Sequence, residues 1–298
     1  MWFSKAHAYG NDFLYVEASI VVRARLDALA REMCDRHTGA GADGLIVYSV
    51  MPRGARHVPG TEPLRATMTL FNADGGRAEV SGNGVRGLAA LLLRDENREK
   101  ASVTIETDAG PKQLTRISRA ADSVPSVPGT CLAPTDRQSP TGRQTFRAAM
   151  GLPRDVRQLP LTAAGETLTA VVLDFGNPQC IVLGPLPDER RFRTLGAALE
   201  HHQMFPAGTN VEFAAVEQPD TVRILIWERG VGPTMSSGTG SCAALVAAAS
   251  FGGAAREADV IAPGGAQRVN WTDENVFLTG WAEVVFDGEW CRQIPRTP

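Results

Sequence analysis

Two stretches of the chain share one plan: residues 70–84 read LFNADGGRAEVSGNG, and residues 226–240 read IWERGVGPTMSSGTG. Each runs from an apolar strand through a polar loop to a Ser-Gly-x-Gly motif. In each, an aromatic residue (Phe71 or Trp227) lies ten positions before the motif's first serine. Each motif then opens an apolar segment of small residues, which is typical of a buried helix. The repetition predicts a duplicated chain with two similar lobes.

A second pair of stretches repeats in the same order, since Gly10-Asn11 and Gly176-Asn177 each precede an apolar strand. Two repeats in one order make chance similarity between glycine loops a weaker explanation. Short runs rich in β-branched or apolar residues predict strands over 45–50, 67–71, 103–106, 170–175, 211–214, 223–227 and 279–286. The expected helices cover residues 25–36, 85–93, 191–202 and 241–249.

The domain organisation follows from length and from one compositional shift. At roughly 150 residues per domain, a chain of 298 residues predicts about two domains. Residues 118–145 are rich in Ser, Pro, Thr and Arg, which suits a connection. We expect an N-terminal lobe of residues 1–120, to which residues 281–298 return, and a C-terminal lobe of residues 121–280.

Composition excludes several classes of function. The formal net charge is −3, whereas nucleic-acid binding favours a basic surplus on one face. The N-terminus has no signal-peptide pattern, and no apolar run approaches the roughly 20 residues that a membrane span needs. Five scattered cysteines without a CxxC pair indicate reduced thiols and no zinc site. We therefore expect a cytoplasmic protein without metal, nucleic-acid or membrane partners.

The two glycine motifs are expected at helix starts, where backbone N–H groups lack intrahelical partners and the helix dipole adds positive charge. Glycine lets a ligand approach closely, so such a start suits a carboxylate or phosphate. Serine at this place is also a favoured N-cap for structural reasons alone. Two motifs at equivalent places favour one carboxylate between two helix starts. Ser81 and Ser237 would then flank the neighbouring carbon for proton exchange.

The motifs resemble the diaminopimelate epimerase family over essentially the whole chain. The resemblance implies an α/β (α+β) fold with two pseudo-symmetric lobes, each a curled β-sheet around a central helix, and a site between them. It also implies an isomerase of lysine and peptidoglycan biosynthesis that racemises or epimerises an amino acid without pyridoxal phosphate or any other cofactor. The matching motifs include Gly10-Asn11-Asp12-Phe13, Phe71-Asn72-Ala73-Asp74-Gly75, Gly82-Asn83-Gly84, Gly176-Asn177-Pro178, Thr209-Asn210-Val211-Glu212-Phe213, Trp227-Glu228-Arg229-Gly230 and Gly238-Thr239-Gly240.

The same resemblance assigns roles to individual residues. The substrate, including the far amino-acid end of a diaminopimelate-like molecule, would be recognised by Asn11, Asn72, Asn177, Asn210 and Arg229. The reacting carboxylate would contact Gly82, Asn83, Gly84, Gly238 and Thr239. The candidate catalytic residues are Ser81, Ser237 and Glu228.

The chain departs from the family at the acid/base positions. The family carries a cysteine in each glycine motif, one as thiolate base and one as thiol acid, where this chain has Ser81 and Ser237. Cysteine has a pKa of about 8.5, which a helix start lowers further. A serine hydroxyl is a much weaker acid and usually needs an adjacent base. We interpret Cys242, inside the second helix, as a core residue rather than a substitute base.

Three interpretations stay open. In the first, the chain is an inactivated double Cys-to-Ser form that traps substrate. In the second, the serines are natural and one of them serves as the acid of an altered isomerase or dehydratase. In the third, the chain is a non-catalytic amino-acid-binding protein. The partner is a small amino acid in each case, and a homodimer is compatible with the sequence. Smaller departures leave the substrate open: Gln179 stands where the family usually has histidine, Pro233 where it often has glutamate, and Tyr9 beside the Asn11 loop.

Overall fold

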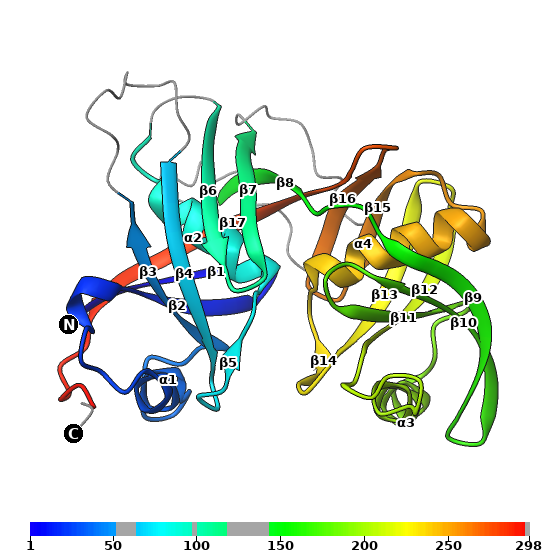
Figure 1. Cartoon of the computed structure of the whole chain (residues 1–298), viewed down its shortest axis with the longest axis horizontal. Helices are drawn as coiled ribbons and strands as arrows, with labels where there is room; N and C mark the ends of the chain where they lie inside the picture. The colour runs from blue at the N-terminus through cyan, green and yellow to red at the C-terminus, as the bar shows by residue number, and fades with distance from the viewer. Residues whose placement is uncertain (52–63, 97–99, 118–142, 296–298) are drawn as a thin grey trace. The chain divides into compact units, whose positions relative to one another are not determined.

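The chain divides into two compact units in the computed structural model, which describes residues 1–51, 64–96, 100–117 and 143–295 (Figure 1). The first unit comprises Met1–Arg147 and Trp281–Pro298, and the second comprises Ala148–Gly280. The domain boundary expected at residue 120 and most of the expected connection fall on residues 118–142, outside the described residues. The last residues of that expected connection belong instead to strand β8 (Arg143–Ala149).

The first unit is a mixed sheet that encloses helix α2 (Gly82–Leu92). Strand β1 pairs antiparallel with β2, β2 parallel with β3, and β3 antiparallel with β4. Strand β4 then pairs antiparallel with β5 and parallel with β6, which pairs antiparallel with β7. The other elements are η1 (Ala18–Ile20), α1 (Leu26–Cys34) and the strands β1 (Trp2–Ala8), β2 (Asn11–Glu17), β3 (Gly44–Val50), β4 (Leu64–Asn72), β5 (Arg77–Ala78), β6 (Ala101–Thr107) and β7 (Gly110–Ile117).

The second unit repeats this pairing order around helix α4 (Gly238–Ala247). Strand β10 pairs antiparallel with β11, as β1 does with β2. The strands from β11 to β16 then pair with one another in the same order and the same directions as the strands from β2 to β7. The bounds are β9 (Arg154–Ala163), β10 (Glu166–Asp174), β11 (Pro178–Leu183), α3 (Glu189–Glu200), β12 (Asn210–Gln218), β13 (Thr221–Glu228), β14 (Gly232–Thr234), η2 (Ala248–Gly252), β15 (Glu257–Ala262) and β16 (Gly265–Trp271). The predicted duplicated fold class is confirmed.

Strand β17 (Val276–Glu289) contributes to both units. Its first residues pair with β16 in the second unit, and its later residues pair with β1 in the first. The strand predicted over 279–286 is therefore confirmed in type and is longer than expected at both ends.

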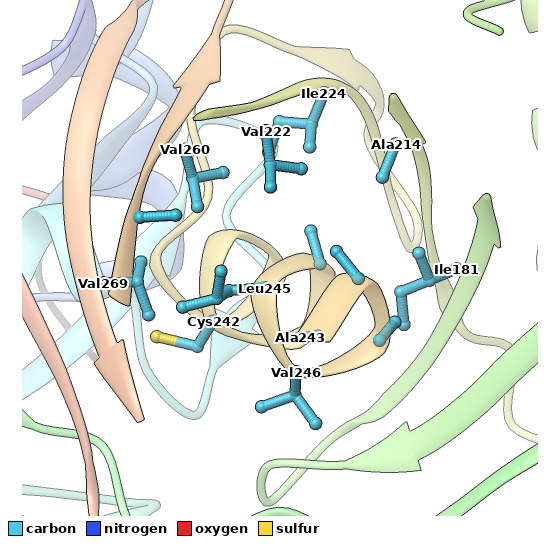
Figure 2. Close-up of a cluster of buried hydrophobic side chains, with 14 of the residues drawn as sticks. Ile181, Ala214, Val222, Ile224, Cys242, Ala243, Leu245, Val246, Val260 and Val269 are labelled. Carbon is cyan, nitrogen blue, oxygen red and sulfur yellow. The ribbon is translucent and has the colours of Figure 1, made fainter. Parts of the chain in front are cut away.

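Helix α4 is largely apolar and is buried among the sheet strands of the second unit. Figure 2 shows its side chains facing residues of β11, β12, β13, β15 and β16. Cys242, Leu245 and Val246 are fully buried, and burying a leucine-sized side chain contributes about 1.5–3 kcal/mol. The interpretation of Cys242 as a core residue is confirmed. The other side chains of α4 in this cluster include the small residues Ala243, Ala244 and Ala247, which let the strands pack closely.

Candidate functional site

Both Ser-Gly-x-Gly motifs begin a buried helix in the same way. Ser81 is the N-cap of α2, and its Oγ accepts a hydrogen bond from the Gly84 N–H at 3.1 Å. Ser237 is the N-cap of α4, and its Oγ accepts from the Gly240 N–H, also at 3.1 Å. Capping by a serine oxygen satisfies one of the helix's orphan donors. The capping interpretation is therefore correct for both serines, and their role toward a ligand stays a prediction.

A close approach favours glycine at the third helical position in each unit. A Cβ atom on Gly84 would lie 2.8 Å from Cδ1 of Ile46. A Cβ atom on Gly240 would collide with the carboxyl group of Glu212, whose carboxyl carbon would be 3.1 Å away. Ile46 and Glu212 are each the third residue of their strand, β3 and β12. The strands that pack against the two helix starts, β3 and β12, therefore occupy equivalent places in the two units.

The candidate residues of the first unit gather around Asp43. Asn11 donates through Nδ2 to Asp43 Oδ2 at 2.7 Å, and Asn83 donates through Nδ2 to Asn11 Oδ1 at 3.2 Å. Asn72 ends β4 opposite Gly44, and the next residue's N–H donates to the Asp43 carbonyl at 3.0 Å. Asn11 and Asn83 therefore meet at the first helix start, and Asn72 ends the strand next to Asp43.

A network of charged side chains lies next to that cluster. Arg36 donates to both Asp12 and Asp43 at 2.7 Å, and Lys5 lies 2.9 Å from Asp12. Burial acts to raise the pKa of Asp12, but hydrogen bonds from Arg36 and Lys5 outweigh it and hold the pKa below its ordinary value. Asp12 is therefore ionised at neutral pH, and the network fixes the loop that carries Asn11.

The candidate residues of the second unit also gather at the helix start. Asn210 accepts from the Arg229 N–H at 3.0 Å through Oδ1 and donates through Nδ2 to the Pro178 carbonyl at 3.4 Å. Asn177 Oδ1 lies 2.9 Å from the Gln179 side-chain amide. Asn177, Asn210 and Arg229 therefore come together from the turn before β11, from β12 and from the turn after β13.

Gln179 connects these residues to Glu212 and to the helix. It is fully buried, and its side-chain amide lies between Glu212 on one side and Asn177, Asn210 and Thr239 on the other. Its neighbours orient the amide so that the nitrogen lies 3.2 Å from both carboxyl oxygens of Glu212, and the oxygen lies 3.3 Å from Thr239 Oγ1 and 3.2 Å from Asn210 Nδ2. Gln179 thus touches three predicted binding residues, although the sequence marked it only as a departure from the family.

Glu212 was missed as a functional candidate. It is fully buried, so desolvation raises its pKa well above the ordinary value, and the nearby Glu228 carboxylate raises it further. Burial and the Glu228 charge therefore both favour the neutral form of the Glu212 carboxyl group. The signal was present in the sequence: an acidic residue stands inside the buried run Asn210–Ala214 of one strand, where an unpaired charge is costly.

A second buried carboxylate holds the turn that carries Glu228 and Arg229. Glu200, 5% exposed, accepts from Trp227 Nε1 at 2.6 Å and from the Gly230 N–H at 2.7 Å. These bonds fix the residues on either side of the Glu-Arg pair. Glu228 itself is half-buried and acts electrostatically on Glu212. The structure therefore places Glu228, Arg229 and the second helix start in one polar cluster.

Across residues 1–51, 64–96, 100–117 and 143–295, no group of three or more His, Cys, Asp or Glu side chains is arranged to hold a metal ion. In the same part of the chain, no helix has the length and apolar character needed to cross a membrane. The expectation of a cofactor-free protein stays a prediction.

Known sequences share this plan over almost their whole length. The family model described as "Diaminopimelate epimerase" matches residues 3–122 and 171–285. A protein named diaminopimelate epimerase from Desulforudis audaxviator is 37% identical, with 98% of this chain and 100% of the relative covered. One of the same name from Acaryochloris marina is 35% identical, with 96% and 97% covered.

Solved structures show the same fold at low identity. A hydroxyproline epimerase from Agrobacterium vitis, with bound trans-4-hydroxy-L-proline, has a TM-score of 0.59 at 15% identity, covering 97% of this chain and 90% of that one. A PhzF-family phenazine biosynthesis protein from Bacillus anthracis has a TM-score of 0.63 at 14% identity, covering 98% and 99%. At this identity the likeness concerns the fold alone.

Proposed function

The chain belongs to the diaminopimelate epimerase family of isomerases, and we propose that it binds the α-carboxylate of an amino acid at its two capped helix starts. The proposed substrate is diaminopimelate or a related amino acid, and the proposed chemistry is cofactor-free epimerisation at the α-carbon. The observation that supports this most strongly is the matched geometry of the Ser81 and Ser237 starts, each with the same 3.1 Å cap to a glycine N–H.

Epimerisation of this kind needs one base and one acid on opposite faces of the α-carbon. Removing the proton leaves negative charge on the carboxylate oxygens as an enediolate. First-turn N–H groups and helix dipoles stabilise charge that develops at such oxygens. The proposal gives the Ser81 and Ser237 positions the two proton-transfer roles. Glu228, Arg229 and the asparagines would orient the ligand.

The serines make turnover by this chain slow. A serine hydroxyl is a far weaker acid than a thiol, and here each Oγ already accepts a helix N–H. A cysteine at the same place would put its sulfur at a helix start, which lowers the thiol pKa toward neutrality. We therefore propose that the chain as it stands binds its amino acid and epimerises it poorly.

The test restores both thiols. The double variant Ser81→Cys and Ser237→Cys is assayed by chiral chromatography against LL-diaminopimelate, L-histidine, L-proline and trans-4-hydroxy-L-proline. We expect epimerisation of one of these, with diaminopimelate the first candidate. Ser19→Cys, which adds an exposed thiol away from both helix starts, is the matched control.

The negative outcomes distinguish the alternatives. Calorimetric binding of a panel member without any epimerisation by the double variant would indicate a binding protein. Loss of water or movement of a double bond, seen by mass spectrometry, would indicate a dehydratase or an isomerase of another kind. Either result would overturn the epimerase proposal.

A further inference from the structure

The turn that carries Asn11 is built on a residue that rarely occupies such a turn. Strands β1 and β2 pair up to Ala8 and Asn11, so their hairpin has a two-residue loop of Tyr9 and Gly10. Both loop residues have a positive φ, 55° at Tyr9 and 86° at Gly10, which is the pattern of a type I′ turn. Such turns favour Asn, Asp or Gly at the first position, because a larger side chain strains the left-handed backbone. Tyrosine therefore stands here against the local preference.

A second turn of the same pattern shows what distinguishes Tyr9. Strands β9 and β10 pair up to Ala163 and Glu166, and the loop residues Ala164 and Gly165 have φ values of 50° and 80°. Ala164 is exposed, whereas Tyr9 is only 2% exposed. The Tyr9 ring is therefore part of the packing of the first unit, and this packing offsets the strain of its backbone.

The Tyr9 ring lies against Trp281 and Arg86. Its centroid is 4.6 Å from that of Trp281 on β17, and its hydroxyl accepts a hydrogen bond from the Trp281 backbone N–H at 3.3 Å. The guanidinium carbon of Arg86, a buried residue of α2, lies 5.6 Å from the ring centroid, within the range of a cation–π contact. The ring thus connects the turn to both β17 and helix α2.

Helix α2 contacts the same turn at a second point. Asn83 of α2 donates through Nδ2 to Asn11 Oδ1 at 3.2 Å, and Asn11 donates to Asp43 Oδ2 at 2.7 Å. Asn83 and Arg86 are three positions apart and are therefore neighbours on the helix surface. Their partners, Asn11 and Tyr9, are two positions apart in one turn. Contacts at both points restrict the movement of the Asn11 side chain.

We propose that Tyr9 is a positioning residue, whose buried ring holds the turn so that Asn11 and Asn83 are prearranged for the ligand at the first helix start. Side chains that are already ordered in the free protein lose less entropy on binding, which favours affinity. The identity of the ligand rests on the proposed function. The fixed geometry of the turn is a property of the unliganded first unit.

The test separates the ring from the backbone. Asparagine tolerates the left-handed conformation, so Tyr9→Asn suits the backbone of the turn but removes the ring that anchors it. Tyr9→Phe keeps the ring beside Trp281 and Arg86 and removes only the hydroxyl. Ala164→Asn makes the same change of turn chemistry at an exposed position of the second unit and is the matched control.

The first arm of the test needs no ligand. The backbone N–H groups of Gly10 and Asp12 donate to His7 Nδ1 at 3.3 Å and to Asp43 Oδ2 at 3.0 Å, so their hydrogen exchange reports on opening of the turn. We expect exchange at these amides, followed by NMR, to be at least about tenfold faster in Tyr9→Asn. Tyr9→Phe and Ala164→Asn should keep the native rates.

The second arm measures LL-diaminopimelate binding by calorimetry, with urea unfolding in parallel. We expect Tyr9→Asn to bind at least about tenfold more weakly and Tyr9→Phe to bind within about twofold of the native affinity, with Ala164→Asn unchanged. A purely structural role would lower the stability of Tyr9→Asn and leave its affinity at the native value.

Native exchange or native affinity in Tyr9→Asn overturns the positioning role, and so does an equal loss in Tyr9→Phe. If the native chain does not bind LL-diaminopimelate while Tyr9→Asn still accelerates exchange in the turn, only the proposed ligand is overturned.

Discussion

One buried hydroxyl contacts the first turn of α2, and this contact gives a prediction with a sign and a size. Tyr15 is 1% exposed, and burial raises the pKa of its phenol well above the usual value, so it remains a donor. Its hydroxyl donates to the Gly84 carbonyl at 2.9 Å. A Cβ on Gly87 would collide with that hydroxyl and would lie 3.0 Å from Cζ of the ring.

The substitution Gly87→Ala therefore sets two effects against each other. Alanine is favoured over glycine inside a helix by about 0.5–1 kcal/mol. Overpacking against a fixed ring costs about 1–3 kcal/mol, and displacing the hydroxyl loses a hydrogen bond worth about 0.5–1.5 kcal/mol. The collision is with a ring on β2 rather than the end of a flexible chain, so we expect a net destabilisation of about 1–3 kcal/mol, measured by urea unfolding.

A double-mutant cycle tests the cause. Tyr15→Phe alone loses one hydrogen bond, about 1 kcal/mol, but it removes the atom that the new Cβ strikes. In the pair Gly87→Ala with Tyr15→Phe, we expect a favourable coupling of about 1–3 kcal/mol, whereas Tyr48→Phe with Gly87→Ala shows none. A neutral Gly87→Ala, or strictly additive effects with Tyr15→Phe, would refute the reasoning.

Three further predictions concern the supports of the site. Glu200→Gln weakens two charge-assisted bonds at the turn carrying Arg229, so urea unfolding should show a loss of about 1–3 kcal/mol and calorimetry weaker ligand binding; unchanged affinity would contradict this role. The depressed pKa of Asp12 gives stability that is present above its unfolded pKa of about 3.9 and is lost as pH falls through the folded value. Arg36→Met should therefore flatten the acid limb of the stability curve, and an unaltered limb would exclude Arg36 as the cause. Ser237→Ala removes an N-cap, so the free energy of unfolding should fall by about 0.5–2 kcal/mol, and an unchanged value would contradict the capping role.

The sequence predicted the duplication because its signal is local. A helix start needs a capping side chain and room for close packing, so Ser237 and Gly240 recur at the same spacing as Ser81 and Gly84. The predicted strands and helices followed from short-range patterns and were confirmed in type. Their ends shifted because pairing partners, which no local pattern contains, extend strands such as β17.

The polar cluster of the second unit was predicted only in part. Asn177, Asn210 and Arg229 stand in motifs and were recognised there. Glu212 stands in a motif as well, but its role comes from its packing against Gly240. Which residue of β12 packs there depends on how the strand is positioned along α4. Register is set by the whole sheet, so a reading of neighbouring residues could not find it.

The central claim is that the two capped helix starts are the proton-transfer positions and that their serines suppress turnover. The most direct measurement is incorporation of deuterium from D₂O at the α-carbon of diaminopimelate, compared between the present chain and the double variant Ser81→Cys and Ser237→Cys. Positioned acid and base groups contribute about 10²–10⁴ in rate, so we predict exchange at least about 100-fold faster in the double variant. Equal rates in the two proteins would contradict the account.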